Sequence, residues 1–178
     1  MQTEHYVLTQ TPLAWLAPWQ ETIDAERWPL RLTGHDGSLL GSCTVRAELK
    51  GRPTAFNLEF LSRTDFAERW NFAAVPSSWR FYLRFAGIRS GSYEERIRSA
   101  VASVAAACAY GVRSEGVWCT PSLHSPNPQD MLAVRDGLRS TVPIWIEIFI
   151  DKPSPPLPGP DRGRESDPGG TVASVLAD

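Results

Sequence analysis

A regular alternation of apolar and polar residues from Trp79 to Phe85 predicts a β-strand with one face toward a core. The pattern then changes to an apolar stripe with helical spacing, formed by Ile97, Val101, Val104 and Cys108. Ser92 and Glu95 have the spacing of a capping box, and Gly111 is placed to end the helix. A strand followed by a capped, alanine-rich helix indicates a domain that combines both kinds of element.

Three further strands are predicted on the N-terminal side of this region, because apolar and polar residues alternate in each of them. Their ranges are 28–32, 38–49 and 56–60. Gly34–Gly37 and Lys50–Pro53 have the composition of turns and separate the strands. Consecutive strands joined by short turns predict an antiparallel meander.

Shorter helical elements are expected on both sides of the meander. Thr11–Arg27 carries an apolar stripe that Pro12 and Pro18 interrupt, so we expect only short helical turns there. Ser62 is placed to cap a short helix that runs to Trp70.

Three elements are expected after the long helix: a short strand at 116–119, a short helix at 129–136 and a strand at 142–150. The last one is apolar on both faces except at Glu147, which is typical of a strand in the middle of a sheet. We therefore predict one α+β domain over residues 1–150, in which a meander-type antiparallel sheet is packed by one long helix and shorter helices. Residues 151–178 are rich in proline and glycine, and we predict a disordered tail.

The composition narrows the classes of function. The 178 residues include 18 basic and 20 acidic side chains, a formal charge of −2, so the chain lacks the basic excess of a nucleic-acid-binding protein. No apolar run approaches the roughly 20 residues that cross a membrane, and the first residues have no secretory pattern. We expect a cytoplasmic protein without direct nucleic-acid or membrane contacts, in which Cys43, Cys108 and Cys119 are buried and reduced.

The residues that could carry catalysis or bind a metal form no recognisable set. His5, His35 and His124 are isolated, and we expect them in loops. We therefore predict no catalytic site, no cofactor and no metal site. Two alternatives stay open: Cys119 with His124 as a nucleophile and its base, and binding of an anion by the amides of Gly87–Ser92 ahead of the helix.

Other side chains could form a binding surface. Arg80, Tyr82 and Arg84 share one face of the predicted strand and could bind a carboxylate, a phosphate or an acidic patch of a partner. The alternative is a solvated face with charge pairs between strands. Three tryptophans in a proline-broken segment either anchor a protein partner or pack over the sheet. They are Trp15, Trp19 and Trp28.

The order of motifs between residues 79 and 150 is distinctive. It consists of WRFYLRFAG, YEERIRSAVASVAAACAYG, EGVWCTPSLHSP, DMLAVRDGL and IWIEIFI. This order resembles that of bacterial immunity proteins paired with type VI secretion or polymorphic toxins. The resemblance implies a protein that binds one toxin and blocks it, by masking its active site or preventing its assembly, without catalysis or a cofactor. Since we expect the chain in the cytoplasm, a nuclease is the preferred toxin.

The partner surface is predicted from the aromatic and arginine side chains that anchor protein interfaces and from the loop before the helix at 129–136. The candidates are Trp19, Arg80, Tyr82, Arg84, His124, Asn127 and Asp130. Two other functions stay open. One is a small-molecule-binding module or cryptic enzyme with a deep pocket at the Arg80–Arg84 face, and the other is an adaptor that works through the proline-rich tail.

Overall fold

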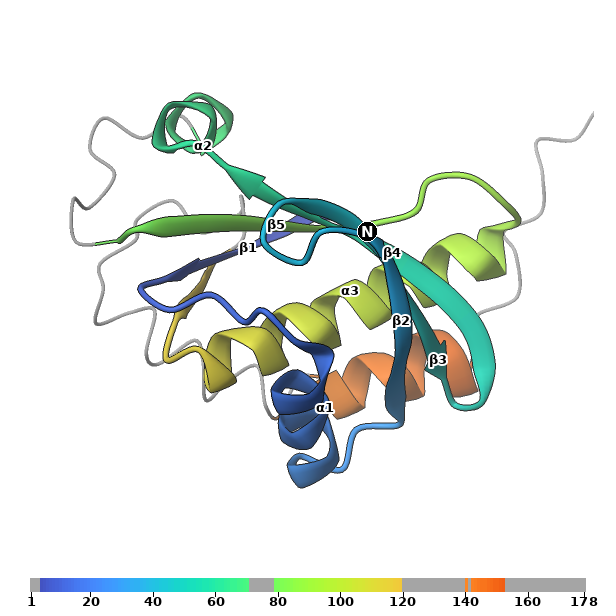
Figure 1. Ribbon diagram of the computed structural model, residues 1–178. Helices are drawn as coiled ribbons and strands as arrows, with labels where there is room; N and C mark the ends of the chain where they lie inside the picture. Colours follow the sequence, from blue (N-terminus) through green and yellow to red (C-terminus); the bar gives the residue numbers. More distant parts are fainter. Residues whose placement is uncertain (1–3, 71–78, 120–139, 141, 153–178) are drawn as a thin grey trace, which may run out of the picture.

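The computed structural model describes residues 4–70, 79–119, 140 and 142–152, and within it a six-stranded sheet with the order β2-β3-β4-β5-β1-β6 (Figure 1). All neighbouring strands are antiparallel. The strands are β1 (Glu4–Thr9), β2 (Leu30–Gly37), β3 (Ser42–Leu49), β4 (Arg52–Leu61), β5 (Phe81–Gly87) and β6 (Val117–Cys119). The helices are α1 (Leu16–Ala25), α2 (Arg63–Trp70), α3 (Tyr93–Arg113) and a C-terminal helix over residues 142–151, which ends in the π-helical turn η1 (Glu147–Asp151). The prediction of an antiparallel sheet combined with a long alanine-rich helix is confirmed.

The helices divide the sheet into two unlike faces. Helices α1 and α3 and the C-terminal helix lie on one face, and α2 lies on the other, at one end of β4 and β5 (Figure 1). The main hydrophobic core fills the space between the sheet and α1, α3 and the C-terminal helix. We call the opposite face the open face, because among the described residues only α2 packs on it.

Helix α3 begins where the sequence predicts. The Ser92 hydroxyl accepts a hydrogen bond from the Glu95 amide, and the Glu95 carboxylate accepts one from the Ser92 amide at 2.7 Å. The predicted end at Gly111 is wrong, because the helix continues to Arg113. Gly111 has no positive φ, and a Cβ added there would make an ordinary contact 3.7 Å from the Val7 side chain, so it is not a left-handed helix stop.

Helix α1 replaces the short turns expected between Thr11 and Arg27. Pro18 is the third residue of the helix, where its missing N–H would have no partner within the helix in any case. Proline therefore does not interrupt a helix at this position. Trp19 and Ile23 are buried and attach the helix to the core.

Strand β1 has no counterpart among the predicted elements. It lies inside the sheet between β5 and β6, and every residue from His5 to Thr9 is buried. Val7 faces the main core, whereas Tyr6 and Leu8 belong to the smaller apolar cluster beneath α2. A strand buried on both faces has no polar alternation by which it can be recognised.

The predicted meander is confirmed as β2, β3 and β4, but one turn is displaced. The strand β2 continues through the expected turn to Gly37, and residues 38–41 make the connection instead. Gly37 has φ +97° and pairs with Cys43 at the start of β3. The Ser62 cap of α2 is also confirmed, because the Ser62 hydroxyl accepts a hydrogen bond from the Asp65 amide at 3.0 Å.

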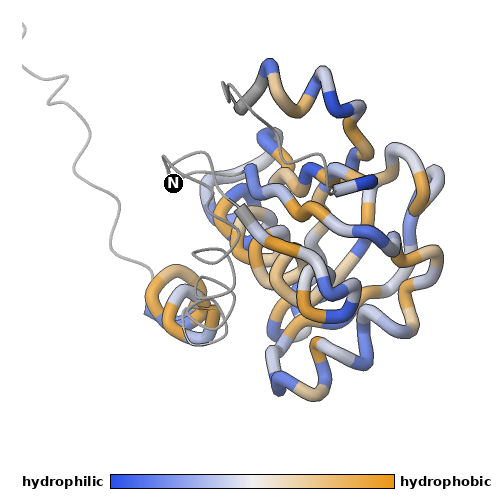
Figure 2. Tube along the Cα trace, turned by 90° about the vertical axis from the view of Figure 1, so that its left-hand side faces the viewer, coloured by the Kyte–Doolittle hydropathy of each residue, from blue (hydrophilic) through white to orange (hydrophobic). Residues whose placement is uncertain are grey.

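The strand predicted at 142–150 is wrong, because these residues are helical. A short apolar run has the same appearance in a buried strand and in a helix packed on a core, so periodicity could not separate the two. Val142 and Ile146 are buried, whereas Ile144 and Ile148 are 52% and 48% exposed. Figure 2 shows this helix nearly end-on, with apolar colouring around most of it. The helix predicted at 129–136 and all but two residues of the 151–178 tail lie outside the described residues.

No helix in the described part of the chain is both long enough and apolar enough to span a membrane.

Candidate interaction surface

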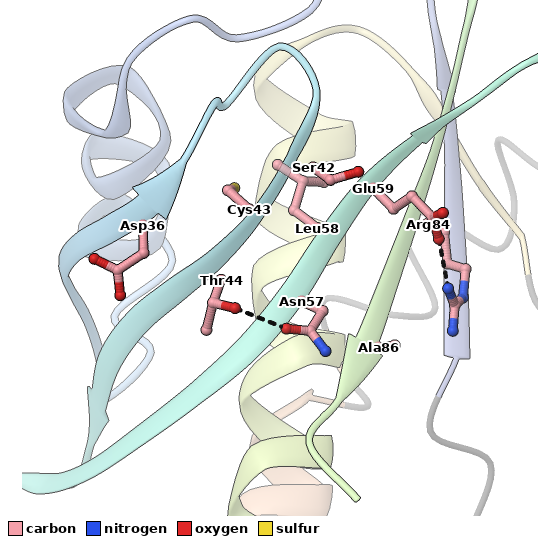
Figure 3. Close-up of a pocket in the computed structure, with 9 residues that line it drawn as sticks. All are labelled: Asp36, Ser42, Cys43, Thr44, Asn57, Leu58, Glu59, Arg84 and Ala86. Atoms are coloured by element: carbon pink, nitrogen blue, oxygen red, sulfur yellow. Dashed lines mark hydrogen bonds and ion pairs between the residues drawn. The ribbon is translucent and has the colours of Figure 1, made fainter.

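The open face carries polar side chains from β2, β3, β4 and β5 around a shallow depression of about 380 Å³ (Figure 3). Its lining residues are Asp36, Ser42, Cys43, Thr44, Asn57, Leu58, Glu59, Arg84 and Ala86. The polar members project from this face because successive side chains of a strand alternate between the two faces. Their apolar neighbours in the same strands belong to the core on the other side.

Arg84 on β5 is the centre of an ion-pair network on this face. Its guanidinium donates to the Glu59 carboxylate at 2.5 Å and to the Glu4 carboxylate at 3.0 Å. Arg89 also donates to Glu4, at 2.9 Å. Glu59 lies directly opposite Arg84 in the β4–β5 register, and Glu4 lies diagonally across on β1. The network therefore joins three neighbouring strands.

These charges are partly withdrawn from water. The side chains of Arg84, Glu4 and Glu59 are 21%, 24% and 33% exposed. Burial alone would raise the pKa of Glu4, but the hydrogen bond and the charge of Arg84 outweigh it and lower the pKa, with help from Tyr6 and Arg89. The pKa of Arg84 is raised: burial opposes this, and the hydrogen bonds and charges of the two carboxylates prevail. Glu4 and Arg84 are thus both charged at neutral pH.

Cross-strand pairs also order the other half of the depression. Thr44 donates to the Asn57 amide oxygen at 3.0 Å, and the two residues lie opposite each other on β3 and β4. Arg46 binds Asp36 at 3.0 Å and lies over Gly34, where an added Cβ would be 3.0 Å from the guanidinium. These contacts agree with the expectation of charge pairs between strands.

The structure separates the three residues predicted to share the β5 surface. Arg84 occupies the open face, and Arg80 is exposed just before β5, 5.5 Å from the Phe81 ring. Tyr82 is only 4% exposed and packs in the cluster beneath α2, where its hydroxyl donates to the Trp79 carbonyl at 3.0 Å. The prediction of Tyr82 as a surface anchor therefore does not fit the structure.

Trp19 is likewise a core residue and not an interface anchor. It is 1% exposed, and its ring packs edge-on against Phe56, Phe85 and Tyr110. Its indole N–H donates to the Ala106 carbonyl at 2.9 Å, so the polar end of the ring is also satisfied. Of the three tryptophans considered above, Trp28 is also buried, and Trp15 is 74% exposed.

Three predicted interface residues, His124, Asn127 and Asp130, lie outside the described residues. So does the proposed pairing of Cys119 with His124. Cys43 and Cys108 are buried, as expected. Burial raises the pKa of the Cys43 thiol to about 11, which keeps it protonated and unreactive at neutral pH.

His5 was expected in a loop but lies in the central strand β1, 1% exposed. Its ring stacks on Trp118 with the centroids 5.5 Å apart, and the Trp145 ring of the C-terminal helix lies 6.5 Å away. Neither ring nitrogen has a hydrogen-bond partner within the described part of the chain. Burial lowers the pKa of His5 to about 4, against the smaller opposing effect of the Glu4 charge, so the ring is neutral at pH 7.

Two amides of the turn before α3 already have hydrogen-bond partners within the chain. The Ser92 amide is bonded to Glu95, and the Ile88 amide donates to the Ser99 hydroxyl at 2.7 Å. The helix cap thus occupies the position where an anion would bind. No group of three or more histidine, cysteine, aspartate or glutamate side chains with metal-binding geometry occurs within residues 4–70, 79–119 and 142–152.

Comparisons with models of protein families, with curated proteins and with solved structures gave no match. The resemblance to immunity proteins therefore remains a prediction from the sequence.

Proposed function

We propose that this chain is an immunity protein that binds a toxin acting in the cytoplasm, with a nuclease as the preferred toxin class, and neutralises it by covering its active site or preventing its assembly. The proposal rests on the order of motifs between residues 79 and 150 and on the open face of the sheet. In this proposal the chain has no catalytic role and acts by binding alone.

The observation that carries the proposal is the position of Arg84. Arginine is enriched among the residues that contribute most to protein interfaces, and a side chain ordered before binding loses less entropy on association. Glu4 and Glu59 hold Arg84 in one orientation beside the depression, with 21% of the side chain still exposed. A partner that packs on this face would meet a preformed polar surface.

The open face extends over several strands, which gives a protein partner a surface on which to pack. A stable interface buries about 800 Å² on each partner, with apolar contacts at its centre and polar groups at its rim. The depression spans β2 to β5. Toxins differ between immunity families, so the partner's own surface is not specified by this geometry.

Co-expression with the product of a neighbouring toxin gene tests the proposal. We expect the toxin to stop growth when expressed alone and the chain to restore growth. Asn57 is exposed within the depression, so Asn57→Arg should block docking and abolish rescue without disturbing the Arg84 network. Glu21→Arg is the matched control, because Glu21 is an exposed residue of α1, on the face that carries the helices.

The purified variants must have the same thermal unfolding midpoint as the parent chain. A loss of rescue then reflects a loss of toxin binding and not a loss of folding. If Asn57→Arg restores growth when it is as abundant as the parent chain, the open face is excluded as the toxin-binding surface. Failure of the parent chain to rescue any toxin from its genetic neighbourhood would end the proposal of immunity.

A small-molecule-binding module is the second candidate, favoured by the depression beside Arg84. Small-molecule sites generally enclose most of the ligand in a largely apolar pocket of roughly 300–1,000 Å³. The depression here has a comparable volume of about 380 Å³ but is shallow and polar (Figure 3). A rise in the melting temperature with a metabolite, lost in Asn57→Arg, would favour this function over protein binding.

A further inference from the structure

Strand β2 forms one edge of the sheet, because among the described residues it pairs only with β3. An edge strand presents a row of backbone N–H and C=O groups that can pair with a strand of another chain. Natural proteins therefore cover, charge or distort such edges. The edge of β2 is eight residues long, which is enough for strand addition unless something blocks it.

The side chain of Gln20, on α1, occupies part of this edge. Its amide oxygen accepts a hydrogen bond from the Leu32 N–H at 2.7 Å, and its amide nitrogen donates to the Leu30 carbonyl at 3.2 Å. One carboxamide thus pairs with a donor and an acceptor that point away from β3. The same two groups would bond to a neighbouring strand in a longer sheet.

Two further contacts fix the Gln20 amide in this orientation. Its nitrogen also donates to the Asp24 carboxylate at 2.8 Å, one helical turn along, so the oxygen must face Leu32. The adjacent residue, Trp19, attaches α1 to α3 through its bond to the Ala106 carbonyl. The helix therefore holds the Gln20 amide against the edge.

A second depression of about 380 Å³ lies along the start of β2. Gln20, Asp24, Trp28, Pro29, Leu30, Arg31 and Leu32 line it. The register of β2 with β3 shifts between Leu32 and Gly34, so a bulge already disturbs the edge beyond the part that Gln20 covers.

We propose that the side-chain amide of Gln20 takes the place of a neighbouring strand at the edge of β2. By occupying the Leu32 N–H and the Leu30 carbonyl, it prevents a second copy of the chain from pairing with β2. The Gln20 amide covers the first part of the edge, and the register shift between Leu32 and Gly34 disturbs the part beyond it. The contact is autoinhibitory, since it occupies the backbone groups through which the sheet would otherwise extend. This inference is independent of the proposed function.

Gln20→Leu tests the proposal, with Glu21→Leu as the matched control. Glu21 is the next residue of α1 and is 67% exposed, so the control adds the same apolar side chain without touching β2. We expect light scattering to give a larger weight-average mass for Gln20→Leu than for the parent chain at equal, near-millimolar concentration. Glu21→Leu should match the parent.

Hydrogen exchange at the Leu32 amide gives a second measurement. In dilute solution we expect exchange at least tenfold faster in Gln20→Leu than in the parent, and renewed protection when the variant self-associates. Gln20→Lys should also exchange quickly but remain at the parent's mass, because a lysine on the edge repels a second copy. Unchanged exchange in both variants, or equal association of Gln20→Leu and Glu21→Leu, would overturn the proposal.

Discussion

The buried His5 ring predicts a loss of stability in mild acid that one substitution should remove. His5 is 1% exposed, and neither of its ring nitrogens is hydrogen-bonded to a residue that the structure describes, so the folded state favours the neutral ring. Burial places its pKa at about 4, compared with 6.5 for an exposed histidine. As the pH falls below 6.5, the unfolded chain takes up a proton that the folded chain does not, and the free energy of unfolding decreases.

The size of this effect follows from the two pKa values. Each factor of ten in proton affinity is worth roughly 1.4 kcal/mol, so the loss reaches about 3 kcal/mol once the pH is below 4. At about pH 5 the linkage relation gives a loss of about 2 kcal/mol relative to neutral pH. The stability is therefore complete above pH 6.5 and declines between 6.5 and 4.

Urea unfolding of the parent chain and His5→Phe at about pH 7.5 and about pH 5 measures this contribution. Phenylalanine keeps a ring against Trp118 and cannot titrate. Glu4 and the other carboxylates are present in both proteins. Their contributions to the pH dependence of the unfolding free energy therefore largely cancel when the change measured for one protein is subtracted from that of the other. We expect the parent to lose about 2 kcal/mol more than His5→Phe between the two pH values. An equal loss in both proteins would refute the reasoning.

Four further substitutions test the packing and the network by chemical or thermal unfolding. Ser92→Ala should cost about 1 kcal/mol, because it removes the hydroxyl that caps α3, and no change would show that the cap is not needed. Gly37→Ala should destabilise the protein more than Gly51→Ala. Both glycines have a positive φ, but of the two only Gly37 lies where an added Cβ would meet the backbone, 2.5 Å from the Ser42 carbonyl oxygen. Equal losses would mean that the hairpin moves to relieve the clash. Arg84→Met should cost about 2 kcal/mol and raise the pKa of Glu4, measurable by NMR titration, since two partly buried carboxylates lose their partner. Trp19→Phe should cost roughly 1–3 kcal/mol through the smaller ring and the lost hydrogen bond to the Ala106 carbonyl, and a smaller effect would place Trp19 outside the rigid core.

Elements with local signals were predictable from the sequence. The α3 cap depends on two residues three positions apart, and the meander on alternation within each strand. Strand β1 and the C-terminal helix lack such signals, because β1 is apolar toward both faces and the helix is apolar around most of its circumference. Their type is decided by the elements against which they pack, and this information is not local.

The candidate surface was predictable only in part, for a related reason. The face of β5 that carries Arg84 followed from alternation, but its partners Glu4 and Glu59 come from strands whose order in the sheet the sequence did not indicate. Tyr82 shares that face and is nevertheless buried, because α2 covers its end of the strand. The location of Trp19 could not be predicted either, because a large amphipathic ring is suited both to an interface and to a core.

Titration of the purified toxin with this chain, combined with hydrogen exchange of the complex, tests the central claim most directly. The account predicts complete inhibition at a one-to-one ratio, with new protection of the amides of β3, β4 and β5 that border the depression. Full toxin activity in the presence of excess chain would contradict the claim of immunity. Protection confined to α1 and α3 would contradict the assignment of the open face as the binding surface.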